Sequence, residues 1–156
     1  MMLSEQEVNR RQKREELMRM GIDPYPAELF DVTHTITNLR DAFADKAGQD
    51  TQGGYESHLD FAGDATYGQV RLAGRMMGFR ISGAASFAEM QDSTGRMQLY
   101  FRRDDLCPGD DKTLYNTVFK KLLDIGDIVG VEGNVFTTLT GELSLYVRSF
   151  KLLTKS

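Results

Sequence analysis

The chain has 156 residues, of which 40% are hydrophobic and 27% charged, and this is enough for one domain with a packed core. Its single cysteine excludes an internal disulfide, and no apolar run suits a membrane span or a signal peptide, so we expect a cytoplasmic protein without a membrane partner. The net charge of −4 argues against a general nucleic-acid coat protein, because that class binds through an overall basic surface.

The first predicted element is a helix over about residues 4–20. Ser4 and Glu7 fit a capping box at its start, and Gly21 suits the position after its end. Four basic side chains form a block on this helix: Arg10, Arg11, Lys13 and Arg14. The helix has little apolar surface before Leu17, so it either stays solvated with Glu–Arg pairs or lies as an arm against phosphates.

Three further segments precede the strand-rich part of the chain. Residues 21–26 contain two prolines, which favour an extended or turning segment. A short helix is predicted over about 37–44, with Leu39 and Phe43 facing inward. Residues 46–66 are rich in Gly, Asp, Gln and Thr, and this composition predicts a linker.

Five strand-like segments follow, with a helix between the third and the fourth. The strands are predicted at about 69–81, 84–91, 97–102, 127–136 and 142–152, and the helix at 112–124. Glycines at positions 74, 78, 130 and 133 suit the bends and bulges that closing a barrel requires. We therefore predict a mainly β fold, a five-stranded OB-fold barrel over residues 67–156, preceded by an N-terminal helical extension and linker over residues 1–66.

The second and third predicted strands form a hairpin with a tight turn at residues 93–95. Because side chains alternate along a strand, Phe87 shares one sheet face with Glu89 and Gln91. The matching face of the third strand carries Arg96, Gln98, Tyr100 and Arg102. OB-folds bind oligonucleotides across these two strands, and a ring beside hydrogen-bonding groups suits unpaired bases. A lone exposed aromatic on a solvated sheet face is also common without any function.

Motifs for catalysis are missing from the sequence. His34 and His58 stand in unrelated contexts, and no Cys/His cluster, phosphate-binding glycine loop or nucleophile elbow is present. The acidic pairs at 104–105 and 110–111 are interpreted as a solvated loop around Pro108 rather than as a metal site. We therefore expect no catalytic residue, metal or cofactor in this chain.

The order and spacing of several motifs resemble the N-terminal anticodon-binding region of class II lysyl-tRNA synthetase of the bacterial type, over nearly the whole chain. These motifs lie at residues 13–17, 21–26, 70–77, 85–87, 91–92, 95–100, 126–128, 140–144 and 151–155. The resemblance implies an OB-fold that grips the anticodon stem-loop of lysine tRNA, whose anticodon is U-rich. It also implies that the catalytic domain, with its ATP and Mg²⁺, is absent from this chain, and that the parent enzyme is a homodimeric ATP-dependent lysine–tRNA ligase.

The resemblance also implies roles for single residues. Phe87 would stack on the central anticodon base, and Gln98 would hydrogen-bond the edge of that base. Arg75 would contact the base or its phosphate, and Glu142 would read a neighbouring anticodon base. The physical chemistry agrees with these roles, because stacking accepts any base while an amide can both donate to and accept from uracil. The basic block of the first helix is the remaining candidate for RNA contacts.

Two alternatives stay open. The anticodon domains of aspartyl and asparaginyl enzymes share the signature of the second and third strands, although the motifs at 21–26 and 151–155 favour the lysyl enzyme. An OB-fold module for protein interaction, without RNA binding, is compatible with the acidic composition. That second alternative would be favoured if the chain's own loops covered the face around Phe87.

Overall fold

The computed structural model describes residues 5–20, 30–46 and 54–156, without some side chains of the first helix. The predicted cap at Ser4, the segment 21–26 and the side chains of Arg10 and Arg14 lie outside the described residues. The helices are α1 (Glu5–Arg19), α2 (Ile36–Ala42), the 3-10 helix η1 (Ala44–Lys46), α3 (Arg103–Leu106) and the π-helix η2 (Leu114–Leu122). The strands are β1 (Val70–Ser82), β2 (Ala85–Gln91), β3 (Arg96–Arg102), β4 (Ile128–Thr137) and β5 (Leu143–Thr154).

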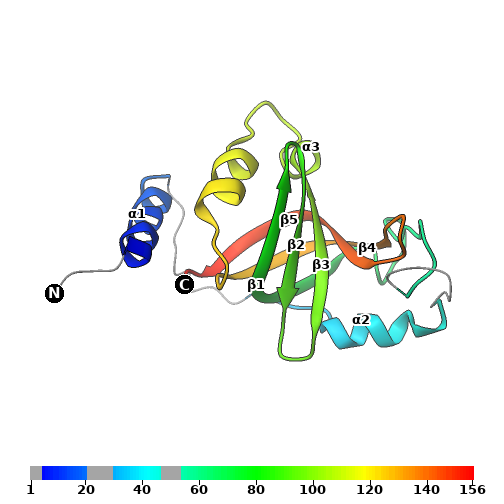
Figure 1. The fold of residues 1–156 in the computed structure, drawn as a ribbon. Coiled ribbons are helices and arrows are strands. Elements are labelled where there is room, and N and C mark those ends of the chain that lie inside the picture. Colours follow the sequence, from blue (N-terminus) through cyan, green and yellow to red (C-terminus); the bar gives the residue numbers. More distant parts are fainter. Residues whose placement is uncertain (1–4, 21–29, 47–53) are drawn as a thin grey trace.

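The strands close into a barrel in the order β1-β2-β3-β5-β4, and β4 pairs back with β1. Only the β3–β5 pair is parallel among these pairings. Figure 1 shows β1, β2 and β3 standing upright while β4 and β5 cross them. Every predicted strand lies within two residues of an observed one, so the predicted five-stranded OB barrel is confirmed.

Two glycines sit where the strands bend to close the barrel. Gly78 follows an irregularity in the pairing of β1 with β2, and Gly133 follows one in the pairing of β4 with β5. At Gly133 an added Cβ would lie 1.9 Å from the carbonyl oxygen of Tyr146, so no larger residue fits without moving the backbone. The predicted link between glycines and barrel closure therefore holds at both positions.

The helix between β3 and β4 differs in type from an ordinary α-helix. The backbone N–H of Leu123 donates to the carbonyl of Val118 at 3.0 Å, five residues back, which is the π-helical spacing. Tyr115, Phe119 and Leu122 lie together in the core, all at 6% exposure or less. Phe119 stacks on Phe101 of β3 with ring centroids 4.2 Å apart. The helix therefore covers one end of the barrel.

The segment that follows β3 was predicted as an acidic loop, and part of it is the single-turn helix α3. Its Asp104 side chain accepts a hydrogen bond from Arg103 at 3.1 Å and lies 3.3 Å from the Lys112 ammonium. These cations hold the pKa of Asp104 below its ordinary value, the hydrogen bond from Arg103 contributing most. The acidic character of this end of the barrel is thus partly neutralised.

Helix α2 begins with a reciprocal cap, since Asn38 N donates to Thr35 Oγ1 at 3.1 Å and Thr35 N donates to Asn38 Oδ1 at 3.0 Å. Its Leu39 and the following Phe43 are buried, as predicted. The described part of the predicted linker, residues 54–66, is attached to the barrel, because Phe61 N donates to Val135 O at 3.0 Å. Tertiary hydrogen bonds with β4 therefore override the loop-like composition of that stretch.

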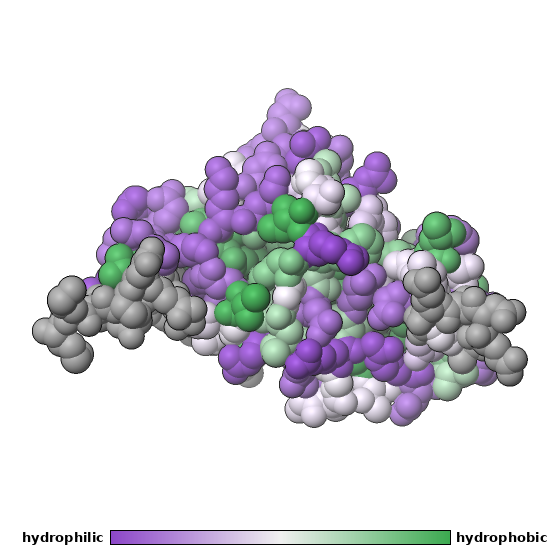
Figure 2. Space-filling model, in the orientation of Figure 1, coloured by the Kyte–Doolittle hydropathy of each residue, from purple (hydrophilic) through white to green (hydrophobic). Residues whose placement is uncertain are grey.

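Helix α1 lies beside η2 at the edge of the molecule (Figure 1) and is attached mainly through buried Leu17 and the Lys13–Asp124 ion pair. The polar composition of α1 explains this position, because the helix has no broad apolar face to bury. In the view of Figure 2, hydrophilic side chains cover most of the surface, and more hydrophobic ones reach it near the middle. None of the helices in the described ranges is long and apolar enough to cross a membrane.

Candidate nucleic-acid interface

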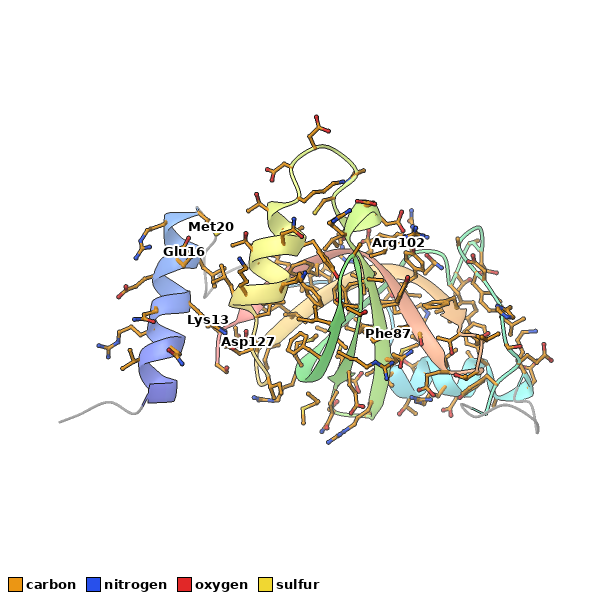
Figure 3. All side chains as sticks on the ribbon, turned by 45° about the horizontal axis from the view of Figure 1, so that its top comes forward. Lys13, Glu16, Met20, Phe87, Arg102 and Asp127 are labelled. Carbon is orange, nitrogen blue, oxygen red and sulfur yellow. The ribbon has the colours of Figure 1, made fainter. Side chains whose placement is uncertain are left out.

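The outer face of β2 and β3 carries the side chains that were predicted to meet bases. Phe87 is paired with Tyr100, and Glu89 with Gln98, so each pair points to the same side of the sheet. The alternate residues of both strands are buried, which confirms the predicted division of the two faces. Figure 3 shows Phe87 on these strands, well away from α1. Phe87 is half-buried, so the chain's own loops leave part of its ring open to solvent.

A shallow hollow of about 270 Å³ opens on this outer face. Three of the predicted site residues line it, namely Phe87 from β2, Gln98 from β3 and Glu142 from the turn before β5. They come from separate segments of the chain, and barrel closure brings them together. The hollow therefore combines a ring, an amide and a carboxylate within one small space.

The amide of Gln98 is oriented by its neighbour on β5. Gln98 Nε2 donates to Ser144 Oγ at 3.1 Å, and Ser144 Oγ donates to the carbonyl of Glu142 at 3.2 Å. Within the described residues Gln98 makes no other side-chain hydrogen bond. Its Oε1 and second N–H are thus available for a base edge, which needs both an acceptor and a donor.

Glu142 is held at the rim of the hollow by its backbone. Its N–H donates to Thr138 Oγ1, and its carbonyl accepts from Thr138 N, both at 3.1 Å. The side chain makes no ion pair with any part of the chain that the structure describes. With its backbone held in place and its carboxylate oxygens free, Glu142 can accept hydrogen bonds from ligand N–H groups.

Phe87 belongs to a row of rings that crosses the sheet. Its centroid lies 5.0 Å from that of Tyr100, and Tyr100 lies 5.0 Å from Tyr146 and 5.8 Å from Phe136. These tilted and edge-to-face contacts hold the rings in fixed orientations. The aromatic row (Phe87, Tyr100, Tyr146 and Phe136) therefore forms a rigid support at the side of the hollow.

The arginine nearest to Phe87 is Arg80, which the sequence reasoning did not single out. Its guanidinium carbon lies 5.0 Å from the Phe87 ring centroid, and Arg80 lines the hollow. Arg75 lies elsewhere, with its Nη1 donating to the carbonyl of Gly126 at 3.2 Å, beside a separate hollow. Because the pairing shifts between Met76 and Gly78, the side chains of β1 after this point lie on the opposite face from the one that simple alternation predicts. Gly78 was the one residue in the sequence that indicated this shift, because glycine often marks a β-bulge.

Helix α2 contributes a second arginine that sequence reasoning missed. Arg40 lines the hollow and its Nη2 donates to the carbonyl of Arg96 at 2.6 Å. Arg96 in turn pairs with Glu89 at 2.8 Å. The lining holds three arginines and two glutamates, so the hollow is locally positive on a chain with a net charge of −4. No sequence motif marks Arg40, because only the docking of α2 brings it here.

The structure does not bring the basic block of α1 to the hollow. Lys13 forms an ion pair with Asp124, and Figure 3 shows it on the side of α1 that faces the barrel. Arg11 is exposed, and the side chains of Arg10 and Arg14 lie outside the described residues. Any RNA contact made by this helix would therefore be separate from the hollow.

Comparisons with known proteins agree with this geometry. The family model for OB-fold nucleic acid binding domains of the tRNA-anticodon type matches residues 70–153. Lysine–tRNA ligases of Christiangramia forsetii and Azobacteroides pseudotrichonymphae are 46% and 47% identical over 99% of this chain. The lysine–tRNA ligase of Moorella thermoacetica is 43% identical over 94% of it.

The chain spans about a quarter of the length of these curated relatives, with 23%, 27% and 25% of each covered. The match runs from the first residue of β1 to residue 153, one residue before the end of β5. The resemblance to lysyl-tRNA synthetase is confirmed by the relatives. The chain therefore belongs to the family of OB-fold nucleic acid binding domains of the tRNA-anticodon type.

Proposed function

We propose that this chain is the anticodon-binding module of a lysine–tRNA ligase and that it reads the U-rich anticodon of lysine tRNA. The observation that carries the proposal is the convergence of Phe87, Gln98 and Glu142 on one hollow of the strand 2–3 face. The names of the relatives support the identity of the tRNA. The partly exposed ring of Phe87 speaks against a protein-interaction module that lacks RNA binding.

Each residue would have a distinct task. The central anticodon base would stack on Phe87, with the Arg80 guanidinium on or beside the same base. Gln98, oriented by Ser144, would hydrogen-bond the edge of that base, and Glu142 would accept from a neighbouring base. Arg75 and the basic block of α1 would add phosphate contacts outside the hollow.

The longer enzyme would supply the chemistry. Its catalytic domain would bind ATP and Mg²⁺ and attach lysine to tRNA, and the enzyme would act as a homodimer in the cytoplasm. The support for this is the length of the relatives and their name as lysine–tRNA ligases. The present module would contribute selection of the tRNA.

The test is titration of anticodon stem-loops that carry each of the four bases at the central position. Phe87→Ala should weaken binding by about 1–3 kcal/mol for all four bases, because stacking has little base preference. Gln98→Ala should reduce the preference for U, since base-edge hydrogen bonds carry the sequence information. Gln69→Ala, at an exposed glutamine outside the hollow, is the matched control.

All variants should remain folded at the temperature of the titration, as melting curves will check, because neither Phe87 nor Gln98 is fully buried. Normal binding by Phe87→Ala, or a loss that simply follows unfolding, would show that the ring is structural and that the proposal is wrong. A stem-loop of aspartate tRNA in the same titration separates the lysyl from the aspartyl alternative. Tighter binding of the aspartate stem-loop would favour the latter.

A further inference from the structure

Two arginines stand on the opposite side of the aromatic row from Gln98. Arg102 follows Tyr100 by two residues on β3, and Arg148 follows Tyr146 by two residues on β5. Tyr100 pairs with Tyr146 and Phe101 with Val147 across these parallel strands, so each arginine directly follows the last paired residue of its strand. The outer face is therefore ordered in three rows: an amide row (Gln98 and Ser144), the aromatic row, and an arginine row (Arg102 and Arg148).

Both members of the arginine row are exposed. Arg102 forms no ion pair within the part of the chain that the structure describes. Hydrogen bonding to Tyr146 is the largest cause that raises the pKa of Arg102 above its ordinary value, and the charge of Asp105 acts in the same direction. Arg148 lies with its guanidinium carbon 4.0 Å from the Tyr146 ring centroid, and its Nε donates to Asn134 Oδ1 at 3.1 Å. The Arg148 guanidinium is thus anchored at one side, while Arg102 is exposed beside Tyr146.

The acidic groups nearby are already engaged. The hydroxyl of Tyr146 donates to the carboxylate of Asp105, and Arg148 Nη1 lies 3.9 Å from the same carboxylate. Burial and then this hydrogen bond raise the pKa of Tyr146, so the phenol keeps the proton that it donates. Asp104 is paired with Arg103 and Lys112. Because both carboxylates have partners, neither stands as an unpaired negative charge that would repel an anion from Arg102.

We propose that Arg102 and Arg148 bind the phosphodiester groups of the RNA strand whose bases lie on the aromatic row. The backbone then crosses the sheet along the arginine row, and the base edges point across the rings toward Gln98 and Glu142. Two residues along a strand span about 6.5–7 Å, a length comparable with the separation between a base and its own phosphate. The planar fork of arginine donors matches phosphate oxygens. Figure 3 shows Arg102 at the end of β3, further along the strands than Phe87.

This inference rests on the proposed RNA-binding function and adds the course of the backbone. The experiment measures binding of the lysine-tRNA anticodon stem-loop over a salt series by wild type, Arg102→Gln, Arg148→Gln and the double variant. Each lost phosphate contact should reduce the slope of log K against log salt by about 0.7–0.9. Base preference at the central position should not change. Lys121→Gln, which removes an exposed charge on η2, is the matched control and should keep the wild-type slope.

A second probe locates the contact along the RNA. Stem-loops with one uncharged methylphosphonate linkage, placed at each position of the anticodon loop in turn, should bind wild type less well at one or two positions. The double variant should no longer respond at those positions. If the double variant proves unstable, Arg102→Gln alone can be tested with the same stem-loops. This single variant should stay folded, because Arg102 is exposed and has no ion pair in the described chain.

The possible failures can be told apart. One outcome is that wild type binds the stem-loop through Phe87 while the arginine variants keep its salt slope and its response to every uncharged linkage. In that case the arginine row does not bind phosphates, and the proposed function stands. If wild type does not bind the stem-loop at all, both proposals fail.

Discussion

At the scale of single residues, the candidate site depends on which side chain meets the Phe87 ring. Arg80 lies over that ring in the free protein, at 5.0 Å from its centroid, and carries no ion pair in the described chain. A base that stacks on Phe87 must either displace this guanidinium or slide beneath it. In both cases Arg80 would lie next to the base, whereas Arg75 donates to the carbonyl of Gly126.

We predict that Arg80→Ala weakens binding of the lysine anticodon stem-loop by about 0.5–2 kcal/mol, because a cation on an aromatic or base face contributes about that much. Arg75→Ala should have a smaller effect, because its side chain lies beside another hollow. Stem-loop titration at one salt concentration compares the two variants directly. A larger loss of affinity for Arg75→Ala would show that Arg75, the residue expected from the sequence, contacts the base or its phosphate.

At the scale of elements, the turn between β2 and β3 is joined to the start of α2 by the Asp92 carboxylate and by two hydrogen bonds from Thr37 to Thr94. Asp92 Oδ1 accepts from Thr94 N at 2.7 Å and Gly95 N at 3.0 Å, and Asp92 Oδ2 accepts from Ile36 N at 2.8 Å. Burial pushes the pKa of Asp92 upward, but the hydrogen bonds together outweigh it and leave that pKa lowered. The same contact therefore shapes the hairpin and holds α2, with Arg40, beside the hollow.

We predict that Asp92→Asn lowers the free energy of unfolding by about 1–2 kcal/mol at neutral pH, since hydrogen bonds to a charged acceptor are lost. A lowered folded-state pKa stabilises the protein above the ordinary carboxyl pKa, and this stabilisation disappears as the pH falls through the folded value. The difference in melting between wild type and Asp92→Asn should therefore shrink below about pH 4. Asp41→Asn, at an exposed position on α2, is the control. A difference that is the same at pH 7 and pH 3 would contradict the role of the charge.

At the scale of the whole molecule, a charge network ties the two ends of the described chain to the barrel. Lys155 Nζ lies 2.7 Å from carboxylate oxygens of both Asp124 and Asp127, and the side chains of Lys155 and Asp127 are fully buried. Asp124 also pairs with Lys13 of α1. Burial alone would raise the pKa of Asp124. Hydrogen bonds and the charges of the two lysines outweigh burial, so the pKa of Asp124 lies below its ordinary value. The network is therefore balanced only when both lysines are present.

We predict that Lys155→Met destabilises the fold by about 3–5 kcal/mol, because it leaves a buried carboxylate without its cation. The double variant Lys155→Met with Asp127→Asn should recover part of that loss, since the unpaired charge is removed as well. Lys121→Met, at an exposed lysine, is the control. Urea unfolding gives the free energy of unfolding of wild type and of each variant. A Lys155→Met variant as stable as the control would show that the pair contributes nothing.

The sequence by itself determined the parts that depend on neighbours along the chain. Alternation placed Phe87 and Gln98 on the outer face, residues 93–95 marked the hairpin turn, and the order of strands and helix identified the barrel. Apolar spacing also located the helix before β4, but its π-type turns were not foreseen, because the apolar spacing of this stretch is equally that of an α-helix.

Only the tertiary structure decided which distant residues meet. The changed phase at Gly78 put Arg80 beside Phe87, docking of α2 brought Arg40 to the hollow, and Lys13 became the partner of Asp124. Residues 54–66 likewise pair with β4 despite their loop-like composition. Local periodicity follows from backbone geometry, which the chain carries everywhere. Contacts between remote segments follow from how the barrel closes, and no local pattern encodes them.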